Sequence, residues 1–504
     1  MPSGANPLTD NTSAAPNSRW TAPRKITLFA IVALALAIRL VAIDWGLPDS
    51  SHRWPYHPDE SNLFVRTREA VLGLRPLGLA HGITFFGIYG TWTVAGAGLG
   101  LFPLHADAYV ADPSHLYGLY LWNRILTVLI STATVVLVFA VSQQLGLSQE
   151  SSALAAFFQT ILPFAVLHAK YLTPHSANAA LFLLAILLHL RRSHPSLISF
   201  AALLTTACEY ALAPLWFVLL IAERGEDKSR LHAYLAIGLA GVALFANILV
   251  DPSSWFATLK GQSHFFNILG LGPIDLAGIM GPAASYTILA AGTAGLALLS
   301  KRRRARPTIM AVAVTGLALL ALGSPFSRRY APLYPFLAIG AAKLVEWIPL
   351  RSPVRVFLVL LLIVEPAARC ISLTTALIDS DTRSVARTAI ESAIAPDSGT
   401  IALQNWFFAP HLSMNAYQFQ MLDAHGEGGG SARFILTTEF NRPDPRTLRP
   451  PRYRSIVTVE RHHTFAGFVF DDRSWPEDLR YANPGIWLFE DMGTPEVIKS
   501  SSFE

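Results

Sequence analysis

Two adjacent carboxylates, Asp59 and Glu60, have the residue type and position best suited to chemistry in this chain. They belong to His57-Pro58-Asp59-Glu60, which follows an apolar segment, 26–43, long enough to cross a bilayer. Charge is costly near hydrocarbon, so an acidic pair at the exit of a membrane helix is a candidate functional site. The tetrapeptide also suits a first helical turn, because proline fixes φ and acids favour the positive end of the helix dipole.

The composition is that of a membrane protein. Hydrophobic residues make up 52% and charged residues 14% of the 504 residues, whereas charged residues reach about 25% in typical soluble domains. The small net charge of +5 lies mostly in loops expected in the cytoplasm, which favours a role in topology over nucleic-acid binding. Cys208 and Cys370 both lie in apolar runs, so no disulfide framework or thiolate metal site is expected.

The elements that must position the acids are membrane helices. Apolar stretches occur at 26–43, 84–104, 119–141, 153–168, 177–190, 197–222, 231–250, 283–300, 307–322, 331–347 and 354–371. We expect about eleven membrane helices, with 84–104 lying along the outer face and 197–222 broken into two short helices. Arg19, Arg24 and Lys25 precede the first stretch, which places the N-terminus in the cytoplasm and the acids outside.

This topology also places a pair of arginines, Arg328 and Arg329, on the outer face, against the positive-inside rule. They stand beside Tyr330 and between two prolines, Pro325 and Pro332. Guanidinium groups bind phosphate through two parallel hydrogen bonds, so the pair suits a phosphate head group at the membrane surface. The alternative is that both arginines contact lipid phosphates without specificity.

Several histidines map to the same face, among them His57, His175 and His264. Together with Asp59 and Glu60 they could supply ligands for a divalent metal, but no closely spaced ligand motif accompanies them. Taken alone, each is better explained as a hydrogen-bonded loop histidine than as a metal ligand. No other cofactor is indicated.

The order of these motifs resembles the C superfamily of polytopic glycosyltransferases. Within it, the chain looks most like bacterial relatives of protein O-mannosyltransferases (glycosyltransferase family 39-like) and of the lipid A aminoarabinose transferase. The segments that carry the resemblance are 44–48, 57–60, 85–89, 168–173, 329–336 and 381–383.

The resemblance implies transfer of a sugar from a polyprenyl-phosphate donor to a hydroxyl of a protein, lipid or glycan acceptor at the outer or periplasmic face. Asp59 matches the carboxylate to which the family's general base role is assigned. Glu60 would orient the acceptor or hold a metal. The donor phosphate would contact cationic and phenolic groups, namely Arg328, Arg329, Tyr330 and Lys170. Displacement with one base would invert the anomeric centre, and retention would need a second carboxylate close by.

Two positions depart from the family pattern. His175 stands where the family commonly has Asp, and Glu209 where it commonly has Lys before Tyr. Three explanations stay open: a different donor head group, replacement of these groups by Lys170 and Asp112, or impaired catalysis.

Three regions are expected: a disordered cytoplasmic tail (1–24), a transmembrane glycosyltransferase domain (25–375) and an extracytoplasmic α/β domain (376–504). In the last, 383–394 is typical of an amphipathic helix, and 400–403 and 433–438 of buried strands. We expect an integral protein of the cell (inner) membrane. A lipid or sugar flippase, or a non-catalytic member of the same fold, is the alternative function, although the internal repeats of transporters are not evident.

Overall fold

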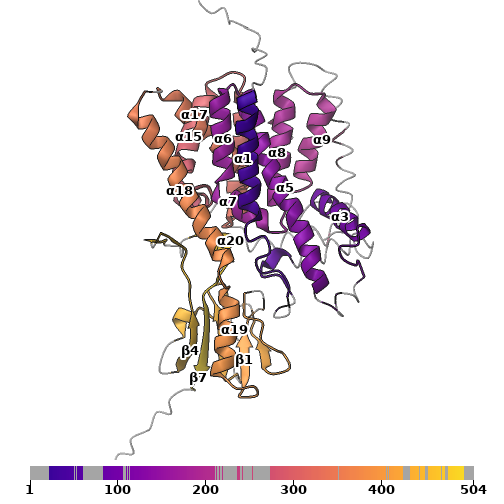
Figure 1. Ribbon diagram of the computed structural model, residues 1–504, viewed down its shortest axis with the longest axis vertical. Helices are drawn as coiled ribbons and strands as arrows, with labels where there is room; N and C mark the ends of the chain where they lie inside the picture. The colour runs from indigo at the N-terminus through magenta and orange to yellow at the C-terminus, as the bar shows by residue number, and fades with distance from the viewer. Residues whose placement is uncertain are drawn as a thin grey trace, which may run out of the picture.

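The computed structural model consists of a helical membrane region followed by a small domain built on a mixed sheet (Figure 1). Together with single positions between them, the structure describes residues 22–49, 54–60, 83–105, 114–209, 273–349, 351–404, 408–423, 432–441, 443–448, 452–466, 468–470 and 475–492. This architecture agrees with the predicted class, a helical polytopic membrane protein with a C-terminal α/β domain. The predicted domain boundaries at 24–25 and 375–376 stay predictions.

The helical region is built from apolar helices that pack closely. Its elements are α1 (Ala22–Leu40), α3 (Ile83–Gly98), α5 (Ser114–Gln144), α6 (Gln149–Thr160), α7 (Pro163–Leu167), η1 (His168–Lys170), α8 (His175–Leu190), α9 (Pro195–Thr206), α14 (Pro273–Ala284), α15 (Tyr286–Ser300), α16 (Arg306–Ala321), η3 (Ser327–Tyr330), α17 (Tyr334–Trp347) and α18 (Pro353–Ile378). The backbones of α15 and α17 touch, because a Cβ added at Gly295 would lie 1.7 Å from the Gly340 carbonyl oxygen. Small residues at such crossings let membrane helices approach each other.

By length and composition, two helices in the described part of the chain can cross a membrane, or up to four if each bent pair is one span. The two helices are His115–Gln144 and Pro353–Ala393. The bent pairs join α6 to α7 at 58° and α14 to α15 at 105°. The first bend comes just before Pro163. A proline has no backbone N–H to donate and its ring clashes with the preceding helical turn, so the preceding helix ends there. The expected number of about eleven membrane helices stays a prediction.

A buried arginine, Arg39, joins α1 to α5 and α6. Its guanidinium donates to Ser131 Oγ at 2.8 Å and to the carbonyls of Gln159 and Thr160 at 3.1 and 3.3 Å. Those two carbonyls lie in the last turn of α6, where helical N–H partners run out. Arg39 therefore stabilises the break between α6 and α7.

The C-terminal domain is a five-stranded sheet with the order β2-β1-β3-β7-β4. Its elements are α19 (Thr382–Ala393), β1 (Thr400–Leu403), β2 (Gln418–Met421), β3 (Phe434–Thr438), η4 (Pro445–Thr447), β4 (Tyr453–Val459), β5 (Thr464–Phe465), β6 (Phe468–Val469), α20 (Glu477–Arg480) and β7 (Ile486–Asp491). β1 is parallel to β2 and β3, while β7 is antiparallel to β3 and β4. Ala386 and Ile390 of α19 share a core with Ile401 and Leu488 of the sheet. The predicted helix and both predicted strands are present.

Side-chain contacts tie the sheet domain to the helical region, with α18 leading directly towards α19 (Figure 1). Arg383 is fully buried and donates to the carbonyls of Tyr56 at 3.1 Å and Tyr481 at 2.9 Å. Its guanidinium also lies 4.0 Å from the centre of the Tyr56 ring, and Asp381 neutralises it at 2.8 Å. The loop that carries His57-Pro58-Asp59-Glu60 is thus held against the C-terminal domain.

Candidate active site

Glu60 is fully buried in a paired, hydrogen-bonded position. Its two carboxylate oxygens accept from Arg124 Nε at 2.9 Å and Nη2 at 2.6 Å, and the Leu172 amide donates to Oε1 at 2.6 Å. Arg124 Nη1 donates to the carbonyls of Ile43 and Trp45, both at 2.7 Å. The pair therefore joins the loop after α1 to α5 and to the segment after η1. A buried ion pair is tolerated when its charges are so fully hydrogen bonded.

Asp59, the preceding residue of the same helical turn, has its carboxylate in a different environment. Its Oδ2 lies 2.9 Å from Arg328 Nη1, and the Asp59 side chain is 28% exposed. Residues 58–60 are helical, which confirms that the tetrapeptide begins a helical turn. The same turn brings Asp59 into contact with Arg328. Two residues that the sequence analysis selected for different roles are thus brought into contact.

His57 stabilises the helical turn that carries Asp59. Its Nδ1 accepts the Asp59 backbone N–H at 3.3 Å, and its ring lies 4.4 Å from the Tyr171 ring and 5.2 Å from the Tyr481 ring. Burial lowers the pKa of His57 to about 4, so the imidazole is neutral at pH 7 and Nδ1 can accept.

Arg328 is oriented by the C-terminal domain. Asp478 of α20 is fully buried and accepts from the Ser327 amide at 3.1 Å, Ser327 Oγ at 2.9 Å and the Arg328 amide at 2.7 Å. Burial raises the pKa of Asp478, while the Arg328 charge and these hydrogen bonds oppose the rise. Arg328 Nη1 also donates to Tyr481 Oη at 3.2 Å, and its guanidinium lies 4.4 Å from the Phe326 ring centre. The turn η3 and its arginine are thus fixed on several sides.

Arg329 contacts a different acid. Its Nη1 lies 2.6 Å from Glu209 Oε1, and the two side chains are 16% and 10% exposed. Glu209 stands where the resemblance led us to expect a lysine. Its carboxylate neutralises the charge of Arg329. Successive residues of a helical turn do not face the same way, and Arg328 and Arg329 accordingly bind separate carboxylates.

The remaining predicted phosphate ligands contact other parts of the fold. Tyr330 is buried and donates to the Ser324 carbonyl at 3.3 Å. Lys170 is buried in η1 and donates from Nζ to Thr374 Oγ1 of α18 at 3.3 Å.

Two of the predicted histidines lie in one aromatic cluster, and the third lies outside the described residues. The His168 ring is 5.7 Å from both the His175 and the Tyr171 rings, and the His57 ring packs against the same Tyr171 in a tilted arrangement. The third, His264, falls outside the described residues. Within the part of the chain that the structure describes, no group of three or more His, Cys, Asp or Glu side chains is arranged to hold a metal. The metal hypothesis for His57, His175 and His264 stays a prediction.

Three residues of the site, Arg124, Asp478 and Tyr481, were not predicted from the sequence. An arginine inside the apolar stretch 119–141 was a detectable signal, because charge within a membrane helix generally has a partner. Asp478 and Tyr481 had no such signal, since they lie in a polar domain with many acids and aromatic residues.

Neither a protein-family model nor a curated protein matches the sequence. Solved structures do match the fold. The apo oligosaccharyltransferase of Archaeoglobus fulgidus has a TM-score of 0.50 and 10% identity, with 89% of this chain and 74% of that chain covered. ArnT from Cupriavidus metallidurans, bound to undecaprenyl phosphate, has a TM-score of 0.50 and 13% identity, with 93% and 98% covered. The chain therefore shares its fold with these two structures.

Proposed function

We propose that this protein is a membrane glycosyltransferase that moves a sugar from a polyprenyl-phosphate donor to an acceptor hydroxyl, with Asp59 as general base. The observation that carries the proposal is the 2.9 Å contact between Asp59 and Arg328. Transfer needs a base for the incoming hydroxyl and a cation for the departing phosphate, and these two groups meet at one point. The fold supports the same conclusion, and ArnT, one of the similar structures, is bound to undecaprenyl phosphate.

In the proposed reaction, the acceptor oxygen attacks the anomeric carbon while its proton passes to the Asp59 carboxylate. The bond between the anomeric carbon and the phosphate oxygen breaks, and its electron pair leaves with the lipid phosphate. Arg328 stabilises that developing charge. Donor binding would draw Arg328 towards the phosphate and leave Asp59 facing the acceptor hydroxyl.

Glu60 is assigned a positioning role, because both of its oxygens already accept hydrogen bonds from Arg124 and Leu172. It fixes the turn on which Asp59 stands. Glu209 and Asp478 are likewise engaged, with Arg329 and with the Ser327 turn. Among the carboxylates that the structure describes around η3 and the tetrapeptide, Asp59 is then the one assigned to the reacting centre, which favours direct displacement with inversion of the anomeric configuration.

The proposed setting is the outer or periplasmic side of the cell (inner) membrane. It keeps the topology expected from the sequence, with about eleven membrane helices, a cytoplasmic N-terminus and an extracytoplasmic C-terminal domain. The acceptor is a protein, lipid or glycan hydroxyl.

The test uses the full chain reconstituted in nanodiscs with radiolabelled mannosyl-phosphate and arabinosyl-phosphate polyprenyl lipids and an envelope extract as acceptor. We expect label to move from lipid to acceptor, and Arg328→Gln to slow this step about 10²- to 10³-fold, the usual effect of losing one charge-stabilising donor. Absence of transfer from either donor would contradict the proposal and favour a non-catalytic member of the fold. Movement of intact labelled lipid across the bilayer would favour a flippase.

A further inference from the structure

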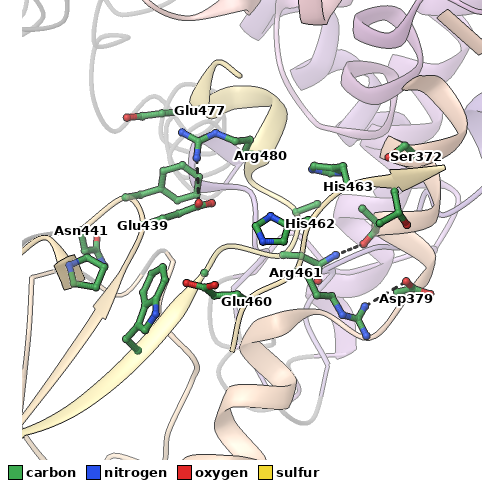
Figure 2. A pocket seen from close by; sticks show the side chains of 18 of the residues that line it. Ser372, Asp379, Glu439, Asn441, Glu460, Arg461, His462, His463, Glu477 and Arg480 are labelled. Atoms are coloured by element: carbon green, nitrogen blue, oxygen red, sulfur yellow. Dashed lines mark hydrogen bonds and ion pairs between the residues drawn. The ribbon is translucent and has the colours of Figure 1, made fainter. Parts of the chain in front are cut away.

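A polar cavity of about 510 Å³ lies between the end of α18 and the sheet domain (Figure 2). Its walls come from α18, the segment after β3, the segment between β4 and β5, α20 and the start of β7. Asp59 and Arg328 are not among its lining residues. α20 lies between the two sites, because Glu477 and Arg480 line the cavity while Asp478 bonds to the Arg328 turn.

The lining combines ring surfaces with charged hydrogen-bonding groups. Phe440, His462, His463 and Trp487 supply the rings. The carboxylates are Asp379, Glu439, Asp444, Glu460 and Glu477, and the guanidinium groups are those of Arg446, Arg461 and Arg480. Because carboxylates outnumber arginines, this cavity disfavours a phosphate or another anion. No metal-holding group of three or more His, Cys, Asp or Glu residues occurs within the described chain.

Two ion pairs hold the walls in place. Arg461 Nη1 lies 3.3 Å from Asp379 Oδ2, and Arg480 Nη1 lies 3.1 Å from Glu439 Oε2. Figure 2 shows these pairs on either side of His462, with Glu460 beside them. Paired charges of this kind offer fixed donors and acceptors together, which is what a ligand with many hydroxyl groups requires.

We propose that this cavity binds a neutral saccharide, as a subsite for the acceptor glycan separate from the Asp59 centre. The inference rests on the proposed function. Carboxylates and guanidiniums match sugar hydroxyls, which both donate and accept, and ring faces match the apolar face of a pyranose. The volume falls within the range of about 300–1,000 Å³ typical of small-molecule sites.

A short chain of side-chain contacts also links the cavity to the reacting centre. Phe440 lines it, and the Phe440 ring lies 5.7 Å from the Tyr481 ring. Tyr481 Oη accepts from Arg328 Nη1 at 3.2 Å, and Arg328 pairs with Asp59. A bound saccharide therefore lies two side chains from the arginine that would serve the donor.

The test measures binding of methyl glycosides of mannose, glucose, galactose and arabinose to the full chain in nanodiscs by saturation-transfer NMR. We expect saturable binding of at least one glycoside. The double variant Glu460→Ala/Arg461→Ala should weaken it about tenfold or more, and inorganic phosphate should not compete. Both residues are exposed, so the variant should fold normally.

The matched control is Arg387→Ala/Glu391→Ala, which removes an exposed pair of the same types, 2.9 Å apart on α19 and outside the lining. It should bind like the wild type. Lack of binding of all four glycosides, equal binding by the cavity variant, or competition by inorganic phosphate would overturn the inference.

The binding assay does not depend on turnover, so the two proposals can fail separately. Glycoside binding without sugar transfer would reject the proposed function and retain the cavity assignment. Transfer without glycoside binding would reject the cavity assignment alone.

Discussion

The buried Glu60–Arg124 pair allows a test of whether Glu60 positions the catalytic turn or reacts itself. Glu60→Gln removes the negative charge but keeps the size of the side chain, so Arg124 is left charged and unpaired at a fully buried position. Removing one partner of a buried pair typically costs about 3–5 kcal/mol. We therefore expect a large loss of stability from Glu60→Gln.

The reciprocal variant Arg124→Gln should be at least as damaging. It leaves Glu60 uncompensated and also removes the donor to the Ile43 and Trp45 carbonyls, each of which costs about 1–3 kcal/mol when left unsatisfied in a buried site. The double variant should be less destabilised than the sum of the single variants, because neither charge is then left alone.

Stability would be measured as resistance to pulse proteolysis across a denaturant series in a fixed detergent, with sugar transfer assayed on the folded fraction. Arg387→Gln, in an exposed pair on α19, is the control and should change stability by about 1 kcal/mol or less. A Glu60→Gln protein with wild-type stability but abolished transfer would refute the positioning role and restore Glu60 as a reacting group.

Three further predictions concern the surroundings of Arg328. Asp478→Asn weakens the charge-assisted hydrogen bonds from Ser327 and Arg328, worth about 1.5–3 kcal/mol. It should lower kcat for transfer about tenfold or more, and an unchanged kcat would contradict the account. Glu209→Gln frees the charge of Arg329 and should tighten binding of polyprenyl phosphate, measured in nanodiscs, whereas unchanged or weaker binding would argue against neutralisation by Glu209. The pKa of His57 is lowered from 6.5 to about 4, so between these values the unfolded state binds a proton that the folded state excludes, and stability falls as pH falls. His57→Gln should make that pH dependence shallower without abolishing it, because burial also lowers the pKa of His411 to about 4; an unchanged slope in thermal unfolding would contradict the assignment.

One contact of the site agrees with the sequence prediction, because the expected topology placed both of its residues on the same face. Asp59 and Arg328 are far apart in the chain, and hydropathy together with the positive-inside rule put both on one face before their contact was known. The helix at 119–141 and the strands 400–403 and 433–438 followed from length and apolar pattern.

The rest depended on packing that one sequence does not encode locally. Arg328 and Arg329 were expected to share one phosphate, yet neighbouring positions of a tight turn diverge, and each binds its own acid. Both Asp59 and Glu60 were expected to take part in the chemistry, Asp59 as the base and Glu60 to orient the acceptor or hold a metal. Their difference comes from Arg124 on a separate helix, which pairs with Glu60, while Asp59 pairs with Arg328. Asp478 acts through backbone amides of a segment some distance away in sequence, which no motif reports.

The most direct measurement of the central claim is the single-turnover rate of sugar transfer by Asp59→Asn compared with the wild type. The control is Asp49→Asn, which changes an exposed carboxylate of the same loop that bonds to His52. A general base contributes about 10²- to 10⁴-fold. The account predicts a loss of that size for Asp59→Asn, with bound donor lipid retained and Asp49→Asn near the wild-type rate. Equal rates for Asp59→Asn and the wild type would contradict it.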